Sequence, residues 1–259
     1  MLRRPIRVLH TSDVHLGPSA TEPGGRQHVE GCLCPIAVLD HLVEEHRIDV
    51  VIVAGDLFDH ARVPDQLVVD TLARLGRLNA DVALFPGNHD VHDETTVYRR
   101  NRSALDASGI AFFDDPLGGS RDLADGALRI WARAMEEHTP DFKPLAGSPA
   151  HPGDRWFVVG AHGHFSPPDG DAYRASRISV EDIDATQADY VALGHWHITT
   201  DLAERGTTIP AWYSGSPLFG HGSGQILLID FNDNDAKRVA VQRLDVLNHP
   251  AAICEGLSG

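Results

Sequence analysis

Five segments of the chain each run an apolar stretch into side chains that can bind a metal ion. These side chains are carboxylates, imidazoles and one amide: Asp13, His15, Asp56, Asn88, His162, His195 and His197. Continuous apolar runs are typical of parallel strands buried on both faces, and we expect several such strands to end at one place. Carboxylate, imidazole and amide groups without thiolates suit manganese, iron or zinc. Two divalent transition metal ions are the simplest occupant of so many ligands, and hydrolysis of a phosphate ester is the commonest use of such a pair.

The ligand spacing predicts two half-sites that share Asp56. Asp13 and His15 are two residues apart. Residues i and i+2 of an extended segment point to the same side, so both can reach one ion. His195 and His197 have the same spacing. We expect one ion to be held by Asp13, His15, Asp56 and His197. The second ion is then held by Asp56, Asn88, His162 and His195.

His89 is the predicted catalytic residue that does not bind metal. It is next to Asn88 and is therefore expected near the leaving group of a phosphate ester attacked by a metal-activated water. A protonated imidazole there can act as a general acid, which typically contributes ~10²–10⁴ in rate. Asp59, three residues after Asp56, is the predicted carboxylate that orients and protonates His89. The chain contains no Gly-x-Ser-x-Gly elbow and no P-loop, so neither covalent serine catalysis nor nucleoside-triphosphatase chemistry is favoured.

The segments that carry these ligands predict an α/β protein. Strands are expected at residues 6–11, 49–54, 82–85, 156–160 and 190–193, and helices at 36–47, 64–78 and 95–107. The β-α-β-α-β order of the first half requires parallel pairing with right-handed crossovers. The last third, at 207–213, 225–231 and 238–244, has the pattern of antiparallel strands. We predict a single domain over residues 1–259, in which residues 114–155 form strands and loops that cover the site as a possible insertion.

Composition bounds the class of protein and its partners. The 259 residues, 42% of them hydrophobic, fit one large domain with a sizeable core. The formal net charge is −15, with 22 Lys and Arg against 37 Asp and Glu, which argues against non-specific DNA binding by this chain alone. No segment approaches the ~18–20 apolar residues of a membrane span. The spacing of Cys32, Cys34 and Cys254 fits neither a zinc knuckle nor a redox pair, which predicts reduced thiols and a cytoplasmic location.

Other polar residues near these motifs are open to two interpretations. They are Arg99, Arg100, Arg102, His92, His164 and His10. The arginines could contact a substrate phosphate, or they could form the solvated face of a helix. The histidines at 92 and 164 could line the site. His10 faces away from the ligands if its strand alternates, which favours a structural histidine in the core.

The ligand motifs resemble those of the calcineurin-like metallophosphoesterase superfamily over about residues 6–231. They are Asp13-x-His15, Gly55-Asp56-Leu57-Phe58-Asp59, Gly87-Asn88-His89-Asp90, His162-Gly163 and Gly194-His195-Trp196-His197. The resemblance implies a four-layer α-β-β-α sandwich with two mixed sheets and outer helices. It also supports the division into two half-sites and a preference for phosphodiesters.

A narrower resemblance is to the SbcD-type DNA repair exonuclease branch of that superfamily. Residues 9–17, 54–59, 188–197 and 213–217 carry it. The branch usually has a further C-terminal region that docks an SMC-like ATPase, which implies such a partner and a nucleic-acid end as substrate if this chain is a nuclease. We therefore predict a metal-dependent phosphoric ester hydrolase acting on a phosphate-ester small molecule. The alternatives are a DNA exonuclease that acts with a partner ATPase, and a catalytically inactive scaffold of the same fold, which the complete ligand set disfavours.

Overall fold

The structure, a computed structural model, describes residues 2–17, 34–167, 170, 173–217 and 222–246. Cys32, Cys254 and the side chain of Cys34, on which the prediction of reduced thiols rests, lie outside the described residues.

Two six-stranded mixed sheets form the centre of the molecule. The first sheet has the order β14-β13-β1-β2-β3-β4, with β1 (Ile6–Thr11), β2 (Val50–Ala54), β3 (Asp81–Phe85), β4 (Ala111–Phe112), β13 (Gln225–Phe231) and β14 (Val239–Asp245). The second has the order β11-β12-β10-β7-β6-β5, with β5 (Gly119–Leu123), β6 (Leu128–Ala132), β7 (Trp156–His162), β10 (Tyr190–Gly194), β11 (Thr200–Asp201) and β12 (Ala211–Tyr213). A small separate sheet pairs β8 (His164–Phe165) with β9 (Arg177–Ile178).

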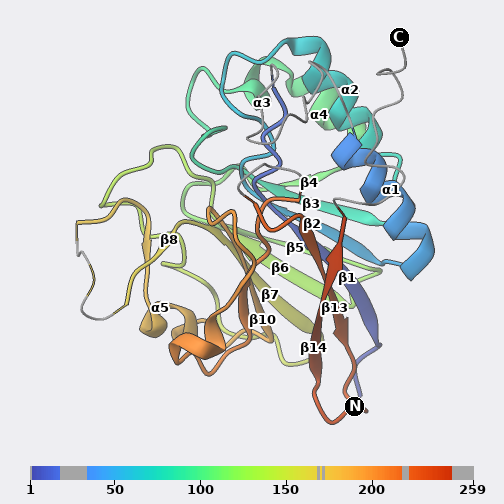
Figure 1. Ribbon diagram of the computed structural model, residues 1–259, viewed down its shortest axis with the longest axis vertical. Helices are drawn as coiled ribbons and strands as arrows, with labels where there is room; N and C mark the ends of the chain where they lie inside the picture. The colour runs from blue at the N-terminus through green and yellow to red at the C-terminus, as the bar shows by residue number, and fades with distance from the viewer. Residues whose placement is uncertain (1, 18–33, 168–169, 171–172, 218–221, 247–259) are drawn as a thin grey trace.

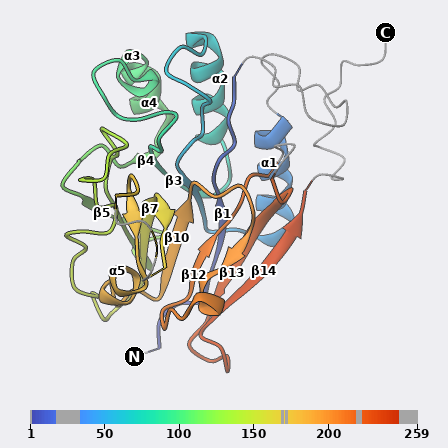
Figure 2. The ribbon, with the colours of Figure 1, turned by 60° about the vertical axis from the view of Figure 1, so that its left-hand side comes forward.

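Helices cover the outer faces of both sheets (Figures 1 and 2). The first sheet is covered by α1 (Cys34–His46), α2 (Asp65–Leu75), α3 (Val97–Arg100) and α4 (Arg102–Ser108). On the outer side of the second sheet lie α5 (Val180–Ala185) and the 3-10 helix η1 (Leu202–Arg205). The four-layer α-β-β-α sandwich predicted from the motif resemblance is therefore confirmed.

Three hydrophobic clusters fill the spaces between these layers. In β2 every residue is buried, because Val51 and Val53 pack towards the helices while Ile52 and Ala54 pack between the sheets. This two-sided burial explains why the strand is a continuous apolar run. A third cluster lies between the second sheet and α5. The strands that end at the candidate ligands are thus the most enclosed elements of the fold.

Parallel pairing brings the carboxyl ends of the central strands together. Strand β2 pairs parallel with both β1 and β3, as the β-α-β-α-β pattern predicts. In the second sheet β7 and β10 are also parallel, and Gly194 pairs with His162. Since the two sheets stack face to face, both sets of strand ends lie at the same edge of the sandwich (Figure 2).

The structure differs from the predicted elements at two places. The helix expected at 95–107 is two short helices, interrupted at Asn101, whose side chain bonds the Val97 carbonyl. Strand β12 pairs parallel with β10 and antiparallel only with the short β11, so the prediction of purely antiparallel strands after residue 207 is wrong there. The strands expected within residues 114–155 are present as β5 and β6, which pair in the second sheet.

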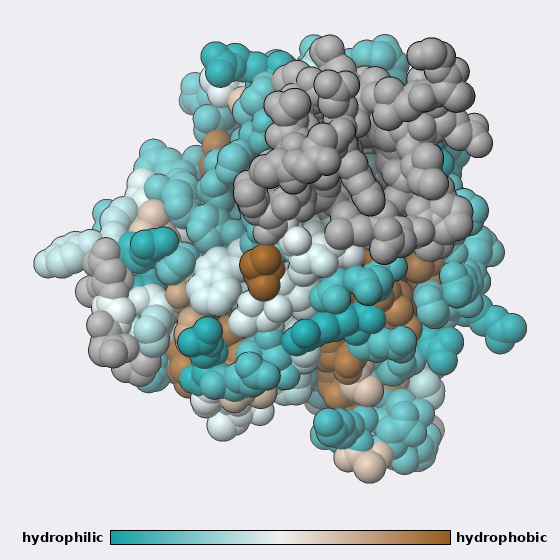
Figure 3. Space-filling model, viewed as in Figure 1, coloured by the Kyte–Doolittle hydropathy of each residue, from teal (hydrophilic) through white to brown (hydrophobic). Residues whose placement is uncertain are grey.

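The surface is mainly polar where it is described. On the face drawn in Figure 3 hydrophilic colour predominates, and hydrophobic colour shows in small separate areas. The large apolar side chains exposed among the described residues are Leu2, Leu117, Tyr173 and Ile198. None of the described helices combines the length and apolar character needed to cross a bilayer.

Candidate metal centre

The predicted ligands lie at the ends of the central strands or in the loops that directly follow them. Asp13 and His15 follow β1, and their backbone N–H groups donate to the carbonyls of Gly55 and Asp56 at 3.1 and 3.0 Å. The loops after β1 and β2 are therefore paired beyond the end of the sheet. This pairing places Asp13, His15 and Asp56 side by side.

Several of these positions have a strained backbone. Asp13, His15, Asp56 and His195 all have positive φ, between 51° and 108°. Non-glycine residues rarely adopt such angles, and where they do the conformation is often part of a functional site. Close packing adds a second constraint, because a Cβ on Gly55, at φ +83°, would lie 2.3 Å from His162 Nδ1. Only glycine can precede Asp56 at this point.

The four side chains of the first predicted half-site converge. Nε2 of His15 and Nε2 of His197 face one another at 3.2 Å. Oδ1 of Asp13 lies 3.8 Å from His197 Nε2, and Oδ2 of Asp56 lies 4.0 Å from His15 Nε2. The side chains of Asp13, His15 and Asp56 are at most 2% exposed. The group therefore combines three buried side chains with His197, which is 33% exposed.

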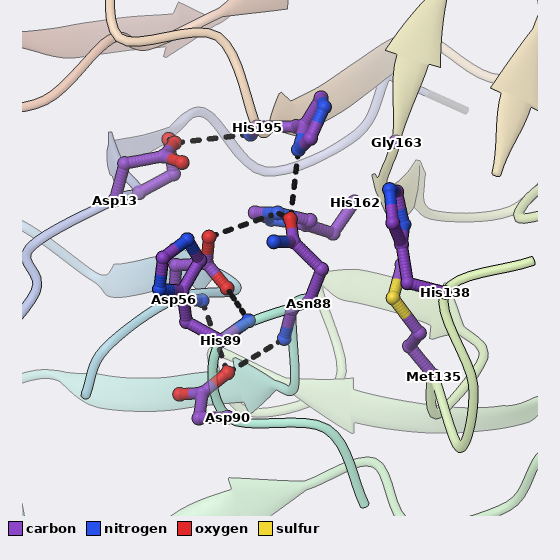
Figure 4. A network of polar contacts seen from close by, with 12 residues as sticks. Asp13, Asp56, Asn88, His89, Asp90, Met135, His138, His162, Gly163 and His195 are labelled. Carbon is purple, nitrogen blue, oxygen red and sulfur yellow. Dashed lines mark hydrogen bonds and ion pairs between the residues drawn. The ribbon is translucent and has the colours of Figure 1, made fainter. Parts of the chain in front are cut away.

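The second predicted half-site is equally compact (Figure 4). Oδ1 of Asn88 lies 3.0 Å from His162 Nε2 and 2.8 Å from His195 Nδ1. Oδ2 of Asp56 lies 3.3 Å from the same His162 nitrogen. The other nitrogen of His162, Nδ1, donates to the Ala54 carbonyl at 2.9 Å. That bond fixes the ring and leaves Nε2 to face the site, which is the usual arrangement of a metal-binding histidine.

The electrostatics of the second group are set by Asp56. Burial lowers the pKa of His162, but the adjacent Asp56 carboxylate outweighs it and raises the pKa to about 9. Burial raises the pKa of Asp56, yet attraction to His162 and His15 brings it well below its usual value. Burial and the positive charge of His162 lower the pKa of His195 to about 3. The two opposite pKa shifts both favour an ionised Asp56 beside a protonated His162.

His89 lies at the rim of this site. Its side chain is 42% exposed, and its ring packs edge-on against His15 with centroids 4.6 Å apart. Nδ1 donates to the main-chain carbonyl of Asp59 at 2.8 Å, which leaves Nε2 free to exchange a proton. The Asp59 carboxylate lies 3.7 Å from that Nδ1 and 3.4 Å from Nδ1 of His15. Asp59 therefore contacts His89 mainly through its backbone.

Asp90 organises the site, a role that the sequence does not predict. Its carboxylate is 1% exposed and accepts backbone N–H groups from Asp56, Leu57, Phe58 and Gly87 at 2.7–3.2 Å. It also accepts the Tyr98 hydroxyl at 2.6 Å. One side chain thus joins the loops after β2 and β3. The only signal in the sequence is its position beside Asn88 and His89.

Three serines hold Asp13 in place through hydrogen bonds. The hydroxyl of Ser12 donates to Oδ2 of Asp13 and lies 2.8 Å from that of Ser214. Ser216 donates to the Asp13 carbonyl at 2.7 Å, and the His195 N–H donates to Oδ2 at 3.0 Å. The segment at 213–217 therefore positions a predicted ligand.

The remaining candidates divide between core and surface. His10 is completely buried between the sheets, where its Nδ1 lies 2.9 Å from the Tyr190 hydroxyl, so the structural interpretation holds. Arg100 pairs with Asp65 at 2.9 Å. Arg99 and Arg102 also have acidic partners, Glu136 and the pair Asp106 and Asp114. These pairs favour the solvated-face interpretation of the arginines.

The donor set fits divalent metal ions. Within the described residues three overlapping groups have ligand atoms within 4.8 Å of one another: Asp13–His15–His197, His15–Asp56–His89 and Asp13–Asp56–His162. Oδ1 of Asp13 is buried and has no hydrogen-bond partner among these residues. An unsatisfied buried carboxylate oxygen is costly, and a cation between facing imidazoles and carboxylates removes that cost.

The fold and the site together define a metallophosphoesterase architecture, and comparison with known proteins gives the family. A model described as "Calcineurin-like phosphoesterase" matches residues 6–199, and the chain belongs to this family. The resemblance inferred from the motifs is thereby confirmed. Membership of this family, together with nuclease relatives, supports the predicted hydrolase.

Two curated relatives and one solved structure illustrate the similarity. The chain is 28% identical over 254 residues to the SbcD component of nuclease SbcCD from Bacillus subtilis, covering 82% of this chain and 62% of that protein. It is 32% identical over 92 residues to the DNA double-strand break repair protein Mre11 of Methanopyrus kandleri, covering 33% of this chain and 19% of that protein. The crystal structure of TT1561 of Thermus thermophilus superposes with a TM-score of 0.56 at 11% identity, covering 94% and 99% of the two chains. The last similarity is one of fold alone.

Proposed function

We propose that the protein is a dinuclear-metal-dependent phosphodiesterase. The observation that carries this proposal is the convergence of the seven predicted ligands on two adjoining groups that share Asp56. Two divalent ions bound there, manganese, iron or zinc, would supply charge neutralisation at the phosphoryl group and activation of the attacking water.

The residues of the chain have distinct tasks in this proposal. Asp56 joins the half-sites. Asn88 and His162 orient one another through their 3.0 Å contact. His89 donates the proton that the leaving oxygen needs, because Nδ1 is engaged by the Asp59 carbonyl and Nε2 can carry the transferable proton. The exposed rim position lets the leaving alcohol depart into solvent.

A second candidate function is a DNA exonuclease that acts with an SMC-like ATPase. The relatives SbcD and Mre11 favour it. The net charge of −15 opposes unaided binding of DNA, so in this case the partner must supply the DNA contacts. The chain spans 62% of the length of the Bacillus subtilis relative, so for this chain the nuclease activity of that longer protein is a proposal. An inactive scaffold is the third possibility, and the complete set of ligands and His89 opposes it.

Substrate and variant assays separate these functions. The purified chain is tested with manganese on a bis-aryl phosphate, an aryl phosphate and single- and double-stranded DNA. We expect hydrolysis of the diester, a ~10²–10⁴-fold loss in His89→Ala with metal content retained, and loss of both activity and metal in Asp56→Ala. Rapid degradation of DNA by the chain alone would establish the nuclease instead. A chain that is inert on every substrate and insensitive to chelators would support the scaffold.

A further inference from the structure

Two histidines outside the predicted ligand set lie beside the second half-site. His138 comes from the loop after β6, and its ring centroid is 5.5 Å from that of His195. His164 comes from β8, and its centroid is 5.9 Å from that of His195. We call His138 and His164 the histidine pair. Figure 4 draws His138 and His89 at opposite sides of the cluster, with Asn88 and His162 between them.

His164 is held in one tautomer. The indole Nε1–H of Trp196 donates to His164 Nδ1 at 3.2 Å. Indole nitrogen is only a donor, so Nδ1 must be the bare nitrogen, and the neutral ring carries its proton on Nε2. Trp196 is itself fixed by stacking on Tyr213, at 4.7 Å and 15°. His164 therefore presents an oriented Nε2–H donor.

His138 is fixed by contacts on both sides of its loop. The N–H of His92, just beyond the Asn88–His89 turn, donates to the Met135 carbonyl at 2.7 Å. The Ser176 N–H donates to the Thr139 carbonyl at 2.9 Å, and the Ser176 hydroxyl lies 3.0 Å from His138 Nδ1. These bonds engage Nδ1 and leave Nε2 as the nitrogen that can meet a ligand. The imidazole is exposed, and yet its backbone is anchored.

The histidine pair and His89 adjoin different half-sites, which matters for the geometry of phosphodiester hydrolysis. In an in-line displacement the attacking and leaving oxygens are on opposite sides of phosphorus, and the other three substituents point sideways. One of these three, in a diester, is the oxygen of the alcohol that stays on phosphorus. A monoester has only an anionic oxygen at that position. His89 packs on His15 of the first half-site, whereas the histidine pair packs on His195 of the second.

We propose that His138 and His164 form a subsite for the alcohol retained on phosphorus, so that the protein selects phosphodiesters of hydroxylated alcohols such as nucleosides over phosphomonoesters. The oriented Nε2–H of His164 is a donor for a hydroxyl or ring oxygen of that alcohol. This inference rests on the proposed phosphodiesterase function.

Three substrates with one leaving group test the subsite. They are an aryl phosphate, an aryl methyl phosphate and a nucleoside 5′-aryl phosphate, which differ only in the group retained on phosphorus. The measured quantity is the ratio of kcat/KM for the nucleoside ester to kcat/KM for the aryl phosphate. His164→Asn keeps an acceptor for Trp196 but removes the Nε2 donor, and His138→Ala removes the second ring. Each should lower the ratio by about 3–10-fold, the effect of one neutral hydrogen bond.

Two controls make the outcome specific. His164→Gln places an amide N–H near the position of Nε2 and should restore most of the ratio. His46→Ala, at the distant end of α1, should leave both the ratio and the basal rate unchanged. Equal ratios in wild type, His164→Asn and His138→Ala would overturn the subsite, as would equal losses in His164→Asn and His164→Gln.

Binding gives a readout that does not depend on turnover. Calorimetry compares a nucleoside 5′-monophosphate, which keeps the retained alcohol, with inorganic phosphate on the manganese-loaded protein. We expect the wild type to prefer the nucleotide and His164→Asn to lose that preference by a similar factor. A wild type without this preference overturns the subsite even if the diester is hydrolysed. If the protein hydrolyses none of the three esters but still prefers the nucleotide, and the variants lose that preference, the subsite is supported and the phosphodiesterase function is refuted.

Discussion

Replacement of Asp90 by asparagine should weaken the fold and the metal site together. The two oxygens of Asp90 accept four backbone N–H groups and the Tyr98 hydroxyl. Asparagine has nearly the same shape, but one of its two polar atoms is an NH₂ group. If the amide oxygen replaces Oδ2, the NH₂ group faces the N–H groups of Asp56 and Gly87, which then have no acceptor.

The magnitude follows from these two lost acceptors. Each buried N–H left unsatisfied costs about 1–3 kcal/mol. Part of this cost is offset, because burial raises the pKa of Asp90, the nearby Asp56 charge raises it further, and asparagine carries no charge. We expect a net loss of about 2–4 kcal/mol in the free energy of unfolding.

The effect on metal binding has the same origin. Asp90 fixes the loop that carries Asp56 and the turn that precedes Asn88. Removal of a partner that orients ligands typically costs 10–100-fold in metal affinity. We therefore expect manganese to bind Asp90→Asn about 10–100-fold more weakly than it binds the wild type.

Urea unfolding of chelator-treated protein measures the first effect, and titration with manganese measures the second. Asp106→Asn is the matched control, since Asp106 is an exposed partner of Arg102 on α4 and its loss should change stability by no more than ~0.5 kcal/mol. An Asp90→Asn protein that unfolds like this control and binds manganese like the wild type would refute the role assigned to Asp90.

Three further predictions concern the rest of the molecule. Burial lowers the pKa of His10 from 6.5 to about 3, so its contribution to the free energy of unfolding is fully present above pH 6.5 and falls by up to ~1.4 kcal/mol per pH unit as the pH drops towards 3. Urea unfolding of the wild type at pH 7.5 and 5.5 should show this loss of stability. The same pH dependence in His10→Gln would contradict the prediction. The side chain of Arg3 is 6% exposed and pairs with Asp189 at 2.7 Å and Asp233 at 2.8 Å, far from the metal ligands. Arg3→Met should lower the free energy of unfolding by about 3 kcal/mol and leave the metal content unchanged. A change in metal content would show that the two ends of the sandwich are coupled. Manganese at 100 times its dissociation constant should stabilise the wild type by ~2.7 kcal/mol and should not stabilise Asp56→Ala. Thermal unfolding with and without a chelator measures this difference. Equal shifts of the unfolding temperature in both proteins would show that Asp56 is not a metal ligand.

The sequence predicts the central strands and the meeting of their ends well, because each such strand is a continuous apolar run closed by a distinct polar residue. The run VVIVA before Gly55 and Asp56 is an example. Pairing partners are less visible: β12 is only three residues long, and its parallel pairing with β10 depends on where the connecting chain runs. At the break, the Asn101 side chain bonds the Val97 carbonyl four residues earlier, a local interaction that helical periodicity does not reveal.

The residues of the site also fall into those that the sequence predicts and those that it does not. Ligands two residues apart at strand ends can be identified because their chemistry and spacing are both unusual. Asp90 cannot, since its partners are backbone N–H groups that any sequence would supply. His138 cannot either, because it reaches the site from a loop whose position depends on contacts with Ser176 and with the His92 backbone. Residues that act through tertiary contacts leave no periodic signal.

The central claim is that two metal ions share Asp56. Anomalous diffraction from crystals of the manganese-loaded protein tests it most directly. We expect two peaks about 3.5–4 Å apart, one among Asp13, His15 and His197 and the other among Asn88, His162 and His195, with the Asp56 carboxylate between them. A single peak, or peaks away from these side chains, would contradict the account.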